Sequence, residues 1–155
     1  MVEVAAVDSV QYFGGGEVRI LAIDHGEKRI GLALSDPTAT IASPLKVVHH
    51  VSRVIDAAQV ADIAAQHGVE LIVVGQSYDE DGNPNPAGRR AGRFADELRS
   101  QTNIPIIMWD ESNSTQIARA ARIELGVSRR KRAGHQDEFA AVVILQSYLE
   151  AKRDA

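Results

Sequence analysis

The sequence predicts an α/β fold in which a mixed five-stranded sheet carries helices on both faces. Two apolar runs, at 18–23 and 29–35, are separated only by a short polar turn, which is typical of an antiparallel hairpin. A further apolar run at 41–50 extends the hairpin to a three-stranded antiparallel meander. Beyond it, segments with a helical period alternate with short buried strands, which indicates crossover connections and parallel pairing.

The end of the first strand carries the acidic residue that most suggests chemistry. Asp24 is the first carboxylate after the run 18–23, so we expect it where the strand leaves the core, reachable by solvent. Gly26 permits a tight turn or the close approach of a ligand. A carboxylate in such a place suits a hard cation such as Mg²⁺. An ordinary Asp-x-Gly turn explains this stretch equally well.

The remaining elements follow from apolar periodicity, caps and turn residues. We expect, in order, a strand at 41–50, a helix that Ser52 caps and that ends near Gly68, a strand at 70–75, a helix at 87–100, a strand at 104–109, a helix that starts within 112–114 and stops at Gly126, a basic loop at 128–135 and a last helix that Asp137 opens.

Length and composition bound the class of protein. With 155 residues, we expect one domain at 17–151, between a flexible extension at 1–16 and a polar tail at 152–155. No cysteine is present, which excludes disulfides and thiolate metal sites. No apolar run is long enough to span a membrane, and residues 1–16 lack the pattern of a secretory signal. We therefore expect a cytoplasmic protein without a membrane partner, either a monomer or a homodimer.

Three carboxylates, Asp24, Glu111 and Asp137, are each expected at the end of an element. Sites in open α/β sheets gather where strands end, so two strand-end carboxylates on neighbouring strands could lie close together. A carboxylate on a helix across the sheet could complete a trio that repels itself unless cations bind. Such a trio suits one or two Mg²⁺ ions acting on a phosphodiester. Singly, Glu111 could face solvent, and Asp137 could simply favour a helix N-terminus.

Clustered cations suggest nucleic acid as the partner, although the net charge is −4. Four consecutive cations shortly precede Asp137 and could hold phosphates near a metal site. A solvated charged surface explains such a run equally well. Arg89, Arg90 and Arg93 could extend the basic track. His25, beside Asp24, could bond a phosphate or be a turn residue. The run consists of Arg129, Arg130, Lys131 and Arg132.

Several separate motifs, in order and over about 18–150, resemble those of the YqgF/RuvX family. They are Ile23–Asp36, Ile72–Gly75 with Asp81–Gly82, Asp110–Glu111 with Ser114–Thr115, Leu125–Arg132 and Asp137–Leu149.

This resemblance implies an RNase H-like fold and a metal-dependent nuclease that uses Mg²⁺ or Mn²⁺. The family's acidic triad falls on Asp24, Glu111 and Asp137. Backbone phosphate contacts fall on Lys28, Arg29 and the basic run. The family's described activities are trimming of the 5′ end of precursor 16S ribosomal RNA and resolution of Holliday junctions.

Three places depart from the family pattern. His25 stands where an apolar or aromatic residue is usual, and residues 76–78 replace the usual Leu-Pro-Leu. Ser112 replaces an Arg, which removes a phosphate or structural contact and bears on substrate affinity more than on the metal site.

Four functions therefore compete at the level of the sequence. The first is a nuclease acting on structured RNA, and the second is cleavage of four-way DNA by the same chemistry, because phosphate contacts do not encode the sugar. The third is a nucleic-acid-binding module without catalysis, which would show salt-sensitive binding only. The fourth, an ATP-using phosphotransferase, is disfavoured because the chain is short and has no second phosphate-binding hairpin.

Overall fold

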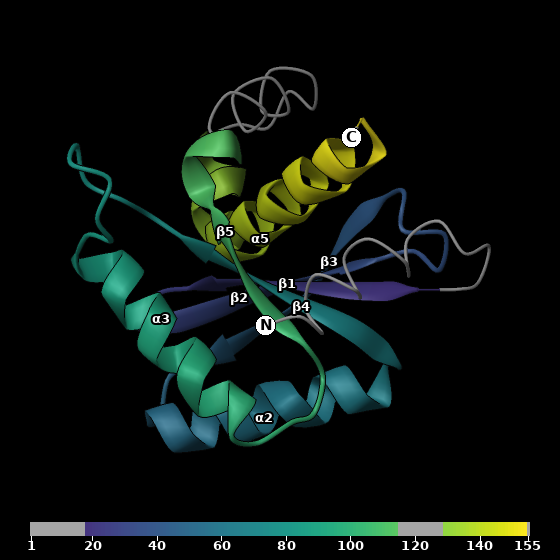
Figure 1. The fold of residues 1–155 in the computed structure, drawn as a ribbon, viewed down its shortest axis with the longest axis horizontal. Helices are drawn as coiled ribbons and strands as arrows, with labels where there is room; N and C mark the ends of the chain where they lie inside the picture. Colours follow the sequence, from purple (N-terminus) through teal and green to yellow (C-terminus); the bar gives the residue numbers. More distant parts are fainter. Residues whose placement is uncertain (1–17, 115–128, 155) are drawn as a thin grey trace.

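The computed structural model describes residues 18–114 and 129–154, and places side chains in 18–112 and 139–154. The expected extension at 1–16 and the expected helix beyond residue 114 lie outside these ranges. Five strands and four helical segments are described (Figure 1). They are β1 (Arg19–His25), β2 (Arg29–Ser35), β3 (Ala42–His49), α2 (Arg53–Gln66), β4 (Val69–Gln76), α3 (Pro86–Arg99), β5 (Ile106–Asp110), the 3₁₀ turn η2 (Glu111–Ser114) and α5 (Arg129–Arg153).

The five strands form one mixed sheet in the order β3-β2-β1-β4-β5. The first three strands pair antiparallel, with Ile23 opposite Leu32 in the β1–β2 register. β4 pairs parallel with β1, and β5 pairs parallel with β4. The predicted meander and mixed sheet are thus confirmed, and β1 lies at the centre with partners on both edges.

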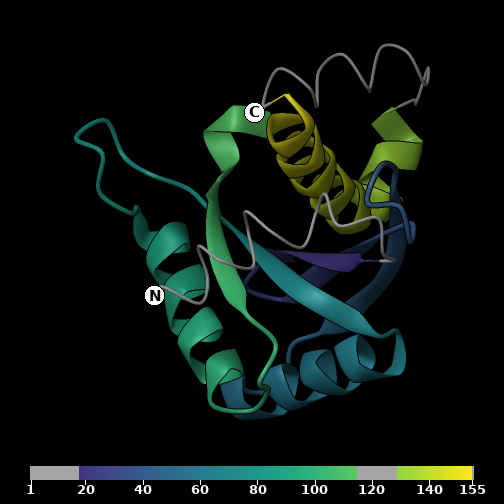
Figure 2. The ribbon, with the colours of Figure 1, turned by 45° about the vertical axis from the view of Figure 1, so that its right-hand side comes forward.

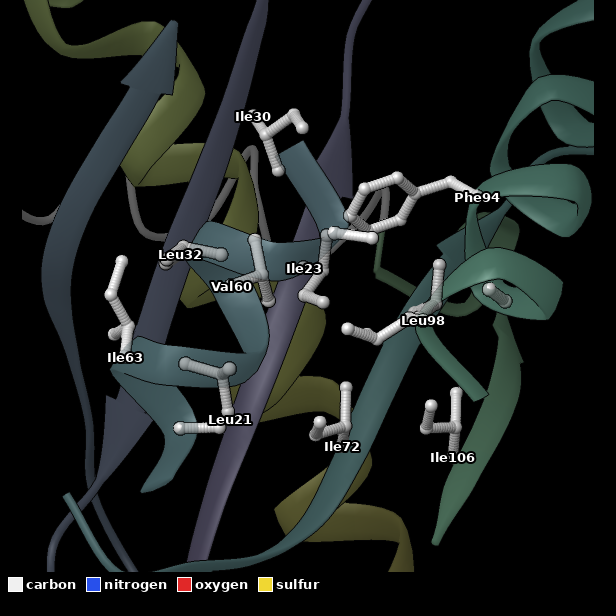
Figure 3. Close-up of a cluster of buried hydrophobic side chains, with 14 of the residues drawn as sticks. Leu21, Ile23, Ile30, Leu32, Val60, Ile63, Ile72, Phe94, Leu98 and Ile106 are labelled. Carbon is white, nitrogen blue, oxygen red and sulfur yellow. The ribbon is translucent and has the colours of Figure 1, made fainter. Parts of the chain in front are cut away.

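Helices cover both faces of the sheet, as predicted. Figures 1 and 2 show α5 on one face, with α2 and α3 on the other. Alternate residues of β1 divide between the faces: Leu21 and Ile23 pack toward α2 and α3, whereas Ile20 and Ala22 pack toward α5. Figure 3 shows the larger core, in which Phe94 of α3 lies against the sheet. Both faces of β1 are therefore buried along most of its length.

Local signals account for most helix boundaries. The Ser52 hydroxyl accepts a hydrogen bond from the Ile55 amide at 3.2 Å, as expected of an N-cap. Asn85 caps α3 in the same way, accepting from the Gly88 amide at 2.8 Å. Gly68 follows α2 with a φ of +64°, a conformation that glycine adopts without strain.

The start of the last helix was predicted wrongly. α5 begins at Arg129, so the four cations occupy its first turn rather than a loop, and position 137 lies inside the helix. Arg, Lys, Ala, Gln and Glu have low helix-propensity costs, so the segment before Asp137 can be helical despite the cost of about 1 kcal/mol for Gly134. At the other end α5 includes Lys152 and Arg153, so the expected polar tail begins within the helix. None of the helices in the described ranges is long and apolar enough to cross a membrane.

The β2–β3 connection predicts a specific pH dependence of stability. Desolvation raises the pKa of Asp36, but hydrogen bonds from the Ile41 amide, Thr38 and the Thr40 amide outweigh it and hold the pKa at about 2. A depressed pKa in the folded state means stability that is present above the unfolded value and is lost as pH falls through the folded one. We expect Asp36→Asn to lower the melting temperature at pH 6, with the difference from wild type shrinking between pH 4 and pH 2. Melting curves across that range test this; a difference that does not change with pH contradicts it.

Candidate active site

Asp24 lies on the α5 face of the sheet, at the end of β1. It is the penultimate residue of the strand and continues the alternation of Ile20 and Ala22, which pack toward α5. Its side chain is half-buried. β2 and β4 flank this end of β1, with Gly31 opposite Asp24 and Val74 beside Ile23. The carboxylate therefore stands on a strand whose backbone is fixed at both edges.

Glu111 reaches the same face by crossing over β4. It follows β5, which is not the neighbour of β1: β4 lies between them, contrary to the expectation of adjacent strands. Gly75 of β4 makes this possible, since a Cβ there would lie 2.9 Å from Glu111 Oε1 and 2.6 Å from Ile144 Cδ1. Gly75 follows Val74, the partner of Ile23. The space above Gly75 is thus filled by the Glu111 carboxylate and α5, beside Asp24.

The strand before Glu111 is attached to α5. The indole of Trp109 donates a hydrogen bond to Ser147 Oγ at 3.1 Å, and its ring meets Tyr148 edge to face at 5.2 Å. Immediately before Glu111, the Asp110 carboxylate accepts a hydrogen bond from the Ser112 amide at 2.9 Å. These contacts fix the turn from which Glu111 projects. Ser112, the position that departs from the family pattern, is exposed and contributes through its backbone.

Burial, and then the negative charge of Asp110, raise the pKa of the Glu111 carboxyl. Both effects penalise the ionised form. A cation placed against Glu111 would act in the opposite direction and favour ionisation.

Asp137 belongs to α5, which packs across β1, β2 and β3. Asp137 lies four residues before Ala141, which belongs to the core on the α5 face together with Ile144 and Tyr148. Its side chain lies outside the described part of the chain, as do those of Arg129, Arg130, Lys131 and Arg132. Among the side chains that are described, no three acidic or histidine residues form a cluster able to hold a metal.

The β1–β2 hairpin carries the two other predicted phosphate contacts. Lys28 and Arg29 are exposed at its tip. The turn is tight: the Gly26 amide donates to the Arg29 carbonyl at 2.9 Å, and a Cβ on Gly26 would lie 2.6 Å from that oxygen. The hairpin therefore presents cations at the same end of the sheet as Asp24.

His25 lies on the opposite face from Asp24 and is the last residue of β1, not a turn residue. Its ring packs on Phe94 with centroids 4.8 Å apart, and burial lowers its pKa. Its Nδ1 is buried without a hydrogen-bond partner among the described residues. It lines a cavity of about 490 Å³ together with Arg53, Arg90 and Arg93. Sequence reasoning missed Arg53, because only folding brings α2 against α3.

Strand order and helix placement define an RNase H-like α/β fold. RuvC of Thermus thermophilus, solved with a Holliday junction substrate, superposes with a TM-score of 0.62 at 16% identity, over 88% of this chain and 96% of that one. The large terminase nuclease from the thermophilic phage G20c superposes with a TM-score of 0.57 at 13% identity, over 84% and 82% of the two chains.

The chain belongs to the RuvX family, whose model, described as Holliday junction resolvase, matches residues 18–151. A relative from Caldanaerobacter subterraneus, named "Putative pre-16S rRNA nuclease", is 36% identical over 139 residues, which are 89% of this chain and 100% of the relative. One of the same name from Syntrophus aciditrophicus is 40% identical over 134 residues, 86% and 89% of the two chains. The family and the RNase H-like fold implied by the sequence motifs are thus confirmed.

Gly75→Ala should disturb this site more than the rest of the fold. The added methyl group has no room between Ile144 and Glu111, so we expect a loss of about 1–3 kcal/mol in the free energy of unfolding. The substitution should also displace Glu111 toward solvent, so that the pKa of its carboxyl falls back toward the ordinary value for glutamate. Urea unfolding and an NMR titration of the Glu111 carboxyl measure the two effects.

Gly92→Ala is the matched control, because the nearest atom to its added Cβ would be Gln76 Nε2 at 3.4 Å. Inside α3 this change should stabilise the fold by about 0.5–1 kcal/mol and leave the titration of Glu111 unchanged. Equal effects of the two substitutions on Glu111 would contradict the assigned role of Gly75.

Proposed function

We propose that this protein is a metal-dependent endonuclease that acts on structured nucleic acid and processes the 5′ end of precursor 16S ribosomal RNA. The observation that carries the proposal is that Asp24 lies on the α5 face of β1 and that the Glu111 carboxylate packs over Gly75 of the adjacent strand β4, on the same face. The names of the curated relatives support RNA as the substrate.

The donor set fits Mg²⁺ or Mn²⁺. Asp24 and Glu111 offer only carboxylate oxygens, and Mg²⁺ needs few protein ligands because it keeps several waters. The raised pKa of Glu111 also fits, since a bound cation would offset both the burial and the charge of Asp110. When bound, the metal supplies an acidified water and a counter-charge for the phosphate. Asp137 is proposed as the third ligand.

The protein's own residues provide position and charge. Asp24 is held by the paired edges of β1, and Glu111 by the attachment of β5 to α5 through Trp109. Lys28, Arg29 and the basic first turn of α5 are proposed to bind phosphates on either side of the reacting one. Hydrolysis adds water to phosphorus and breaks the P–O3′ bond, leaving a 5′-phosphate and a 3′-hydroxyl. Rigid carboxylates of this kind favour a single orientation of the scissile phosphate.

Cleavage of four-way DNA is the second candidate, which the description of the matching family favours. It would use the same carboxylates and the same basic surfaces, because phosphate contacts are shared by RNA and DNA. The two substrates are therefore compared in one experiment, at equal concentration and salt.

We expect Asp24→Asn to reduce cleavage by about 10³-fold or more, since it removes several kcal/mol of charge stabilisation in the transition state. A labelled precursor-16S RNA fragment and a four-way DNA junction are incubated with Mg²⁺, Mn²⁺ or EDTA. Asp62→Asn, which removes an exposed carboxylate from α2, is the control and should cut at the wild-type rate. Melting curves verify that both variants are folded.

Preferential cutting of the RNA supports processing, and preferential cutting of the junction supports resolution. Full activity of Asp24→Asn would exclude the proposed site. If the wild-type protein binds the nucleic acids in a salt-sensitive way but cleaves neither of them with Mg²⁺ or Mn²⁺, the protein is a nucleic-acid-binding module and not a nuclease.

A further inference from the structure

The cavity on the face opposite Asp24 has the chemistry of a phosphate site. Three guanidinium groups line it: Arg53 in the first turn of α2, and Arg90 and Arg93 one turn apart on α3. Arginine side chains present paired N–H donors that match phosphate oxygens. With a volume of about 490 Å³, the cavity has room for a phosphodiester and its waters. The imidazoles of His25 and His50 and the carboxylates of Glu27 and Asp56 also line it.

The carboxylates of this cavity leave two of the three arginines available. Buried Asp56 accepts hydrogen bonds from His50 Nδ1 at 2.5 Å and from the Val51 amide at 2.9 Å. Glu27 pairs with Arg90 at 3.3 Å. Within the described ranges, no ion pair or hydrogen bond engages the guanidinium group of Arg53 or of Arg93, and both side chains are exposed. The cavity therefore presents positive charge that the fold itself does not neutralise.

The cavity lies next to the candidate active site, across the thickness of the sheet. Asp24 and His25 are consecutive in β1, so one side chain faces α5 and the other faces the cavity. The hairpin tip joins the two faces: the Lys28 carbonyl accepts a hydrogen bond from the His50 amide at 2.9 Å, and the Lys28 side chain is exposed. A nucleic-acid strand that passes over this hairpin would meet positive charge from one face to the other.

We propose that the cavity lined by Arg53, Arg90 and Arg93 binds a backbone phosphate of the nucleic-acid strand, a few nucleotides away from the phosphate that would be cleaved at the proposed metal site of Asp24 and Glu111. The identity of the ligand as a nucleic acid rests on the proposed function. The site itself rests on the convergence of the three guanidinium groups. It explains how a protein with a net charge of −4 holds a polyanion: the cations are gathered along one end of the sheet.

The test measures binding in a background that does not depend on cleavage. Two variants are made in the Asp24→Asn background: one adds Arg93→Gln, and the other adds both Arg53→Gln and Arg93→Gln. Their binding to a labelled precursor-16S RNA fragment is followed by fluorescence anisotropy between about 50 and 300 mM KCl. We expect the dissociation constant to rise about 5- to 10-fold per arginine, and the salt slope to fall by about one for each phosphate that a variant no longer neutralises. Arg19→Gln, at the other end of β1, is the matched control and should change binding less than twofold.

Unchanged RNA affinity and salt slope in the double arginine variant would overturn the proposal. Isothermal calorimetry with inorganic phosphate tests whether the cavity binds free phosphate instead of a phosphate of the RNA backbone. If the wild-type protein binds phosphate at millimolar concentration, the double variant does not, and RNA binding is the same in both, the cavity is a site for free phosphate and the backbone assignment is overturned. This binding test does not require cleavage. If the protein cleaves neither substrate, the arginine variants would still bind RNA more weakly than their parent. If the wild-type protein cleaves but the arginine variants bind RNA as tightly as their parent, only the phosphate site in the cavity is rejected.

Discussion

Both sites depend on the side-chain alternation of β1, the central strand of the sheet. β1 is hydrogen-bonded to β2 on one edge and β4 on the other, and it is buried on both faces. A shift of one residue would exchange the two apolar sets that pack against α5 and against α2 and α3. The register of Asp24 and His25 is therefore fixed by the free energy of packing the whole strand. Consecutive residues with different chemistry thus serve opposite faces of the sheet.

Gly75 allows residues from two strands that are not neighbours, β1 and β5, to lie on the same part of the sheet. Glu111 follows β5 and Asp24 lies on β1, with β4 between them. A side chain on β4 at this point would keep the Glu111 carboxylate and Ile144 away from the sheet. The attachment of Trp109 to Ser147 and Tyr148 then holds β5 against α5. The missing side chain at Gly75 and the anchored indole ring of Trp109 together set the position of the Glu111 carboxylate.

The overall charge of the chain conceals how the charges are distributed. Carboxylates gather on the α5 face at the end of β1, while arginines from two helices gather on the opposite face. Asp56 would weaken that basic face, but it is buried and bonded to His50 and to the backbone of Val51. Acidic groups suited to cations and basic groups suited to phosphates therefore lie on opposite faces of the same end of the sheet.

Local sequence determined the meander, the bounds of β2 and the Ser52 cap of α2, because hydrogen-bonded turns, caps and alternation act over a few residues. The family was indicated by the order and spacing of its motifs along the chain. Local patterns also named Asp24 and Glu111 as acids near strand ends. Only the tertiary structure decided that β4 separates them, that Gly75 provides the room, and that Arg53 lines the same cavity as Arg93, which belongs to a distant segment of the chain. Strand order and helix packing are set by long-range burial, which residue spacing along the chain does not encode.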